Sequence, residues 1–157
     1  MNYRRYIEYQ TYVPAILLQT FLAGVMAGVF TWLIYLGLDR YVIGMIMCTD
    51  GNTACGSAQI TSLVLALLVA HFLGLIMLVR AIVMRPLLVV LVSIATLWGF
   101  HAWLDGMTWW MGSLYLGLLF GIAYVFYAWV NRLLYFPVAL VLTIVAVLGA
   151  RVLLMSW

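Results

Sequence analysis

The sequence predicts an all-α integral membrane protein, and both its composition and the lengths of its apolar runs lead to that prediction. Hydrophobic residues occupy 69% of the 157 positions and charged residues 7%, whereas a soluble domain carries roughly 25% charged residues. The mean hydropathy of the chain is +1.22. A domain of this length cannot hide so much apolar surface from water, so we expect lipid to surround most of it. The expected organisation is a single transmembrane domain over residues 1–157.

The apolar residues gather into five runs, each near the roughly 20 residues that a helix needs to cross the hydrocarbon core of a bilayer. A helix is expected in each run because lipid offers no hydrogen bonds to an open backbone. The sequence thus predicts a polytopic bundle of five transmembrane helices, at residues 13–38, 60–79, 87–104, 106–131 and 133–155.

Prolines and turn-forming residues mark the ends of these spans. Pro86 and Pro137 each stand near the start of a span, where the missing amide of proline costs little. Asp105 followed by Gly106 indicates a tight turn between the third and fourth spans. Residues 41–47 are too short to span a bilayer, so they either lie at its surface or extend the first helix beyond it.

The arginines predict the orientation of the chain. All seven basic residues are arginines, and they are too scattered for the net charge of +3 to indicate a nucleic-acid surface. Alternating spans place one group on one side, Arg4, Arg5, Arg80, Arg85 and Arg132, and a smaller group on the other, Arg40 and Arg151. By the positive-inside rule, the N-terminus is cytoplasmic, while the C-terminus and loop 39–59 are extracytoplasmic. A bacterial inner (plasma) membrane is the expected location.

Both cysteines lie in the loop between the first and second spans. Cys48 and Cys55 flank the turn-forming sequence Asp50-Gly51-Asn52. In an oxidising outer compartment they are expected to form a disulfide, which would contribute on the order of 2 kcal/mol in the chain-entropy model. A redox-active pair is the less favoured alternative because the chain has no second pair to relay electrons. A metal site is disfavoured too, because two thiols and Asp50 fall short of four ligands.

One ionisable residue, His71, lies near the middle of the second span. Ionisable residues inside spans are rare and often mark function, so His71 is the best single candidate for a proton relay or a ligand. A neutral histidine that donates one hydrogen bond to a neighbouring helix is the favoured alternative, because no carboxylate lies within the spans to exchange protons with it.

Three further polar residues are expected at the outer boundary. His101 and Asp105 are spaced i, i+4 and so share a helix face. They form either a cation or proton site at the outer mouth or, more simply, an interfacial hydrogen bond. Arg151 should also reach this boundary, where it either pairs with Asp105 or extends to lipid headgroups.

Small residues recur at helical spacing along three of the predicted spans. Such ridges let helices approach closely in lipid, and here they can hold this chain's own bundle or receive another subunit. The ridges are Thr20, Gly24, Ala27 and Thr31 in the first span, Ser113, Gly117 and Gly121 in the fourth, and Ala139, Thr143, Ala146 and Ala150 in the fifth.

The sequence contains no phosphate-binding glycine loop, no H-E-x-x-H motif and no paired intramembrane aspartates. We therefore expect no catalytic residue, no cofactor and no metal. The leading hypothesis is a non-catalytic subunit of a transport, secretion or envelope complex, whose partners are the lipid bilayer and other membrane subunits or copies of itself. One alternative is a small homo-oligomeric transporter or channel that uses His71 or the His101–Asp105 pair. Another is a membrane thiol oxidoreductase that uses Cys48 and Cys55.

Overall fold

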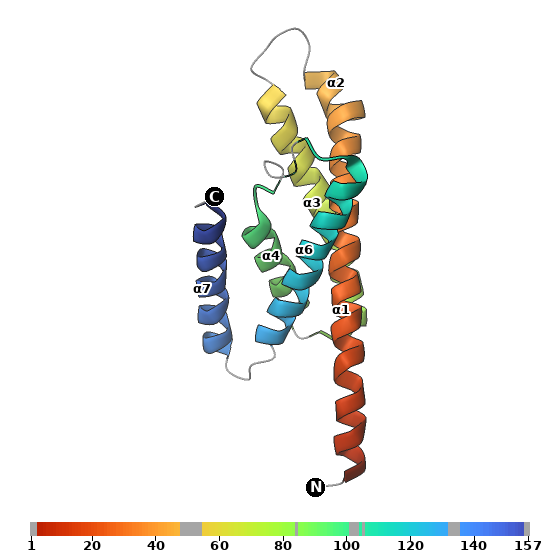
Figure 1. The fold of residues 1–157 in the computed structure, drawn as a ribbon, viewed down its shortest axis with the longest axis vertical. Helices are drawn as coiled ribbons and strands as arrows, with labels where there is room; N and C mark the ends of the chain where they lie inside the picture. Colours follow the sequence, from red (N-terminus) through yellow and green to blue (C-terminus); the bar gives the residue numbers. More distant parts are fainter. Residues whose placement is uncertain are drawn as a thin grey trace.

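Helices make up all of the regular secondary structure in the part of the chain that the computed structural model describes, residues 3–47, 55–83, 85–100, 104, 106–131 and 136–155. Figure 1 shows their arrangement. In chain order the elements are α1 (Tyr3–Leu38), the π-helical turn η1 (Asp39–Ile43), α2 (Gly44–Met47), α3 (Cys55–Arg80), α4 (Pro86–Leu97), α6 (Trp109–Val130) and α7 (Phe136–Met155).

Three of the described helices are long and apolar enough to cross a membrane. They cover Pro14–Ile43, Ser57–Arg80 and Trp109–Val130. A helix of about 20 residues is about 30 Å long, the thickness of a hydrocarbon core. The helical class and the presence of membrane-compatible helices are therefore confirmed, as expected from a chain whose apolar runs have this length.

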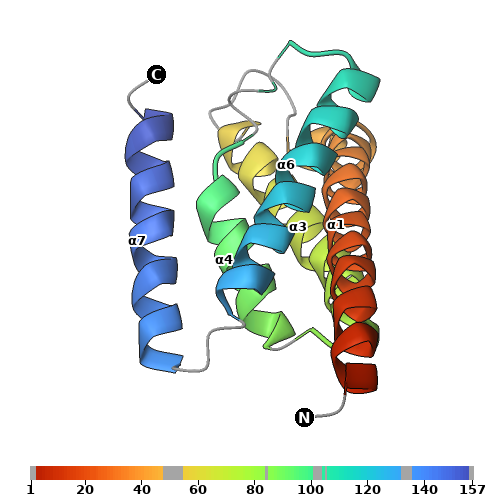
Figure 2. The same ribbon diagram turned by 60° about the horizontal axis from the view of Figure 1, so that its bottom comes forward.

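The helices pack around α1 and α6. α1 lies along α6 and contacts α3 as well, while α4 packs against α6 and α3. α7 packs mainly against α4, with a smaller contact to α6. Figure 2 shows the result, with α7 at the edge of the bundle opposite α1. α7 is thus the helix least enclosed by the rest of the described chain.

Two regions differ from the expected span limits. The third expected span, 87–104, is not one helix: α4 has only 12 residues and ends at Leu97. Gly99 then adopts a left-handed conformation with φ of 91°, which a helix cannot continue through and which glycine tolerates. The chain turns there, and the side chains of Phe100 and Leu104 are buried in the bundle.

The second difference concerns the predicted loop 39–59. Residues 39–47 continue α1 as a π-helical turn and a short helix, which is the helical extension, one of the two arrangements expected for residues 41–47. α3 begins at Cys55, earlier than the expected start of the second span at residue 60. The described helices therefore reach further into this region than the apolar pattern alone indicated.

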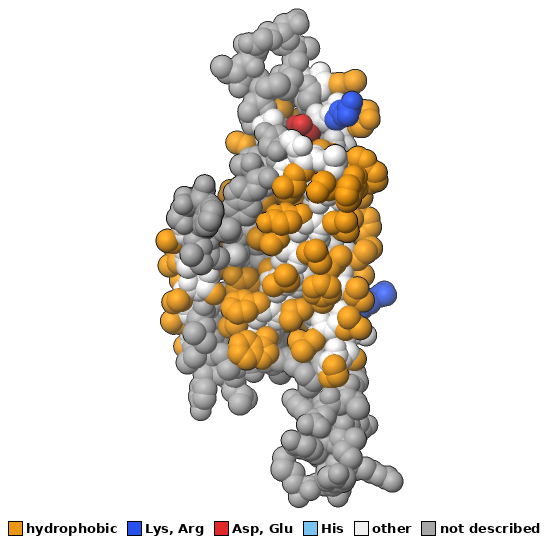
Figure 3. Space-filling model, in the orientation of Figure 1, with side chains coloured by type: hydrophobic (Ala, Val, Ile, Leu, Met, Phe, Trp, Pro, Cys, Tyr) orange, Lys and Arg blue, Asp and Glu red, His pale blue; other side chains and the backbone are white. Residues whose placement is uncertain are grey.

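The outer surface of the bundle is apolar along most of its length. Figure 3 shows one face on which the described side chains are mostly hydrophobic, with few charged ones. Large apolar side chains are exposed on α1, α3, α4, α6 and α7, among them Leu18, Phe72, Leu91, Ile122 and Leu148. Such a surface would be costly in water and suits a lipid environment.

Candidate functional site

α1 and α6 approach each other through facing glycines. A Cβ atom added to Gly24 would lie 2.5 Å from the carbonyl oxygen of Phe120 and 2.8 Å from the Cα of Gly121. A Cβ added to Gly28 would lie 2.5 Å from the carbonyl oxygen of Leu116 and 2.8 Å from the Cα of Gly117. The two glycine pairs run in opposite directions along the two helices, so α1 and α6 are antiparallel with backbones in contact.

The other predicted small residues of α1 and α6 also lie inside the bundle. Thr20 and Thr31 are buried, and each hydroxyl donates a 2.7 Å hydrogen bond to its own helix, to the carbonyls of Ile16 and Ala27 respectively. The side chain of Ala27 is buried, and the Ser113 hydroxyl donates to the carbonyl of Trp109 over 2.8 Å. These two ridges therefore face this chain's own helices.

The predicted ridge of α7 is described only in part. Thr143 is buried and Ala146 is half-buried against the core. The side chains of Ala139 and Ala150 lie outside the described residues. This helix therefore turns some of its small residues toward the bundle.

Close contacts between helices require glycine at three positions that the predicted ridges did not include: Gly28, Gly74 and Gly112. For Gly28 the signal was in the sequence, because Gly24 and Gly28 form a G-x-x-x-G pair that matches Gly117 and Gly121. Gly74 and Gly112 had no partner glycine at this spacing. They are required by bulky side chains on neighbouring helices, which a pattern within one helix does not reveal.

Trp32 extends the contact between α1 and α6 beyond the glycines. Its indole is buried and covers Gly112, where a Cβ would lie 2.5 Å from the ring. The indole N–H donates a 3.1 Å hydrogen bond to the backbone carbonyl of Trp109. Trp32 thus binds α1 to the first turn of α6 through both packing and a polar contact.

His71 lies inside the bundle, where α1, α3 and α6 meet. The residue is 2% exposed, and its ring is 4.5 Å from the ring of Phe120, centroid to centroid, in an edge-on contact. Nδ1 lies 3.1 Å from the carbonyl oxygen of Leu67 and 3.5 Å from the Thr31 hydroxyl. Because a carbonyl can only accept, Nδ1 carries the proton and donates to Leu67.

Most described hydroxyls in the interior are committed to their own helix. Besides Thr20, Thr31 and Ser113, the hydroxyls of Ser62, Ser93 and Thr96 each donate to the carbonyl four residues earlier, at 2.8 to 2.9 Å. Thr96 of α4 also pairs with the Tyr127 hydroxyl of α6 at 2.6 Å. These hydroxyls already have hydrogen-bond partners within the bundle, so they are poorly suited to bind a substrate.

The other predicted polar residues lie outside the described part of the chain. This holds for Cys48, His101 and Asp105, and for the side chains of Cys55 and Arg151 within their helices. The disulfide, the His101–Asp105 pair and the contact between Asp105 and Arg151 therefore stay predictions. Among the residues that are described, no three His, Cys, Asp or Glu side chains gather where they could hold a metal ion.

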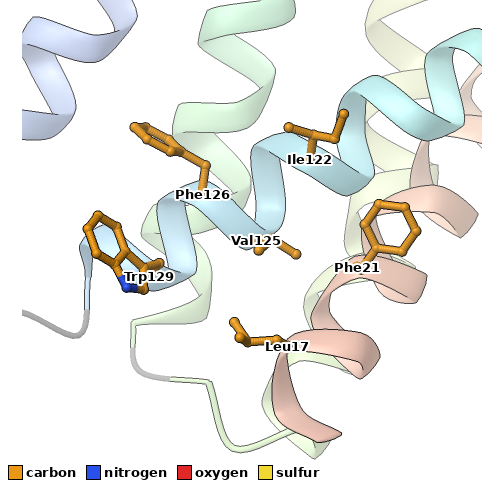
Figure 4. Close-up of a pocket in the computed structure, with 6 residues that line it drawn as sticks. All are labelled: Leu17, Phe21, Ile122, Val125, Phe126 and Trp129. Atoms are coloured by element: carbon orange, nitrogen blue, oxygen red, sulfur yellow. The ribbon is translucent and has the colours of Figure 1, made fainter. Parts of the chain in front are cut away.

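Two grooves open on the apolar surface. The larger, about 360 Å³, lies between α1 and α6 and is shown in Figure 4, where Leu17 and Phe21 of α1 face Val125 and Trp129 of α6. The smaller, about 220 Å³, lies between α1 and α3 and includes Ala27, Ala70 and Gly74. Both are lined by apolar residues, which suits hydrocarbon chains better than a polar substrate.

Comparisons with protein-family models, curated proteins and solved structures found no match for this chain.

Proposed function

We propose that the protein is a non-catalytic integral membrane subunit and that the outer face of α7 receives a transmembrane helix of another subunit or of a second copy. The observation that carries the proposal is Gly149. It lies in the C-terminal half of α7 and is exposed, and no described atom lies within 4 Å of the position that a Cβ would occupy. A glycine inside a helix costs roughly 0.5–1 kcal/mol relative to alanine, so a close helix partner would explain its presence.

The surroundings of Gly149 support the same proposal. Val145 and Val152 are at least 60% exposed, and they stand four residues before and three residues after Gly149, on the same side of the helix. The adjacent Leu148 is 60% exposed as well. Small and branched side chains around a glycine form the shallow surface that suits helix pairing in lipid. By contrast, Gly24, Gly28, Gly117 and Gly121 already meet atoms of their own chain.

A bulky residue at position 149 tests the docking proposal. We expect the wild-type protein to copurify from mild detergent with a stoichiometric partner or as a homo-oligomer, and Gly149→Leu to lose that association at least tenfold, because a leucine side chain would separate the helices. Size-exclusion chromatography with quantitative mass spectrometry measures it. The matched control is Leu68→Phe, a change at an exposed position of α3, which should keep the partner. A monodisperse single chain in the wild type, or full association in Gly149→Leu, would contradict the proposal.

The proposed topology has five spans, a cytoplasmic N-terminus and an extracytoplasmic loop containing the disulfide Cys48–Cys55, in a bacterial inner membrane. Its support is the distribution of the arginines, five against two, on alternating sides of the chain. Because these are the chain's two cysteines, thiol labelling reports on both orientation and pairing.

The expected labelling result is specific. In spheroplasts, a thiol reagent that cannot cross the membrane should label the protein only after reduction, since the disulfide blocks both sulfur atoms beforehand. The variant with Cys48→Ser and Cys55→Ser gives the background. Labelling without reduction would exclude the disulfide, and labelling that requires membrane lysis after reduction would reverse the orientation.

A further inference from the structure

Two neighbouring aromatic residues in the centre of the bundle carry polar atoms without a hydrogen-bond partner among the described residues. They are Nε2 of His71 and the hydroxyl oxygen Oη of Tyr124. His71 is 2% exposed and Tyr124 is 0% exposed. Buried polar atoms in proteins are nearly always paired, with ordered water where protein groups do not serve. Leaving one unpaired is especially unfavourable where lipid surrounds the bundle.

The imidazole of His71 in α3 and the phenol of Tyr124 in α6 lie next to each other. Their ring centroids are 6.1 Å apart. The Tyr124 hydroxyl lies 2.8 Å from the position that a Cβ on Gly74 would occupy. Gly74 follows His71 by three residues and so shares its face of α3. The imidazole of His71 and the hydroxyl of Tyr124 are therefore adjacent at the α1–α3–α6 junction.

The hydrogen-bonding roles of the two atoms are complementary. Since Nδ1 of His71 donates to the Leu67 carbonyl, Nε2 of the neutral ring carries a lone pair and accepts. The phenol of Tyr124 can donate its proton. A ligand between them must therefore donate to His71 and accept from Tyr124 with the same small group. A hydroxyl does both.

We propose that His71 Nε2 and Tyr124 Oη together hold one internal water molecule, which links α3 to α6 at the α1–α3–α6 junction. One water can link atoms about 5–6 Å apart through two hydrogen bonds, and the two rings lie next to each other, with their centroids 6.1 Å apart. Both residues are closed off from the surface, so the water molecule is enclosed by the bundle.

The groove between α1 and α3 lies next to this site. It is about 220 Å³ and is lined by Ala27, Ala70 and Gly74, the last of which also meets the Tyr124 hydroxyl. Gly74 therefore lies between the groove and the hydroxyl of Tyr124.

A double-mutant cycle tests this water bridge between His71 and Tyr124, because the sign of the change in stability distinguishes a bridge from an unpaired hydroxyl. Removing an orphaned hydroxyl from an apolar site would stabilise the protein, whereas removing one arm of a bridge destabilises it. We expect Tyr124→Phe to lower the folding equilibrium constant roughly fivefold, the equivalent of one hydrogen bond, and to have little effect in a His71→Leu background. Detergent-based reversible unfolding measures both. A gain in stability for Tyr124→Phe, or the same loss in both backgrounds, would overturn the proposal.

Tyr127→Phe is the matched control on the same helix. It removes the hydroxyl that pairs with Thr96 over 2.6 Å, so its loss of stability should be the same with His71 or Leu at position 71. This comparison separates the proposed bridge from a general cost of removing tyrosine hydroxyls from α6.

Spectroscopy provides a second test that does not require His71→Leu to fold. In a His101→Gln variant, His71 is the single histidine, and its ¹⁵N resonances report on each ring nitrogen. We expect Nε2 to have the shift of a hydrogen-bonded acceptor, with cross-peaks from water to the ring, and Tyr124→Phe to move that shift toward the free lone-pair value. A free lone pair in the wild type, unchanged in Tyr124→Phe, would refute the water site and leave the docking proposal for α7 intact.

Discussion

Replacing Gly24 or Gly28 with alanine will lower the free energy of unfolding by about 1–3 kcal/mol each, the usual cost of overpacking a well-filled core. At both positions the added methyl group would lie 2.5 Å from a carbonyl oxygen of α6. Backbone cannot rotate away as a side chain can, so α1 and α6 must move apart. Because the two glycines are successive on one face, the double variant should lose the α1–α6 contact. Reversible unfolding in mixed micelles measures these changes.

Gly37→Ala is the control for this prediction. Gly37 belongs to the same helix, and no described atom lies within 4 Å of its Cβ position. Alanine is the better helix former by roughly 0.5–1 kcal/mol, so this variant should be neutral or slightly more stable. If Gly24→Ala, Gly28→Ala and Gly37→Ala all had the same effect, helix propensity rather than close packing would account for the glycines.

The contrast between these glycines indicates how much of the fold the sequence could predict. Composition and run length were enough for the helical class, because lipid imposes continuous helices on any apolar crossing. They were not enough for the end of α4, because the signal in the run 87–104, Gly99, is also common inside membrane helices. The left-handed Gly99 depends on how Phe100 and Leu104 fit into the core, which is a property of the assembled bundle.

The candidate site was predictable to the same partial degree. His71 stood out in the sequence because ionisable groups are rare inside spans. Tyr124 did not, because one tyrosine among ten carries no signal until α3 and α6 are packed together. The pairing of Gly74 with the Tyr124 hydroxyl is likewise a contact between helices. A motif within one helix reveals which face of that helix packs against a neighbour. A site between two helices depends on how those helices are aligned with each other.

The second large effect is expected at Trp32, where α1 meets the first turn of α6. Trp32→Ala should lower the free energy of unfolding by about 3–5 kcal/mol, the range for truncating a buried tryptophan. The indole is 4% exposed, covers Gly112 and donates to the Trp109 carbonyl over 3.1 Å. Its loss would leave a cavity beside a glycine that has no side chain to fill it.

Two companion variants separate packing from hydrogen bonding at this position. Trp32→Phe retains an aromatic ring but no N–H donor, so it should lose less than Trp32→Ala, with about 1 kcal/mol of its loss due to the hydrogen bond. Trp109→Ala should change stability by less than about 1 kcal/mol, because the Trp109 side chain is 65% exposed and the accepting carbonyl belongs to the backbone. Equal losses of stability in Trp32→Ala and Trp109→Ala would mean that the indoles act as lipid anchors and not as a contact between α1 and α6. A large loss at position 32 alone would assign this end of the bundle to a contact within the chain.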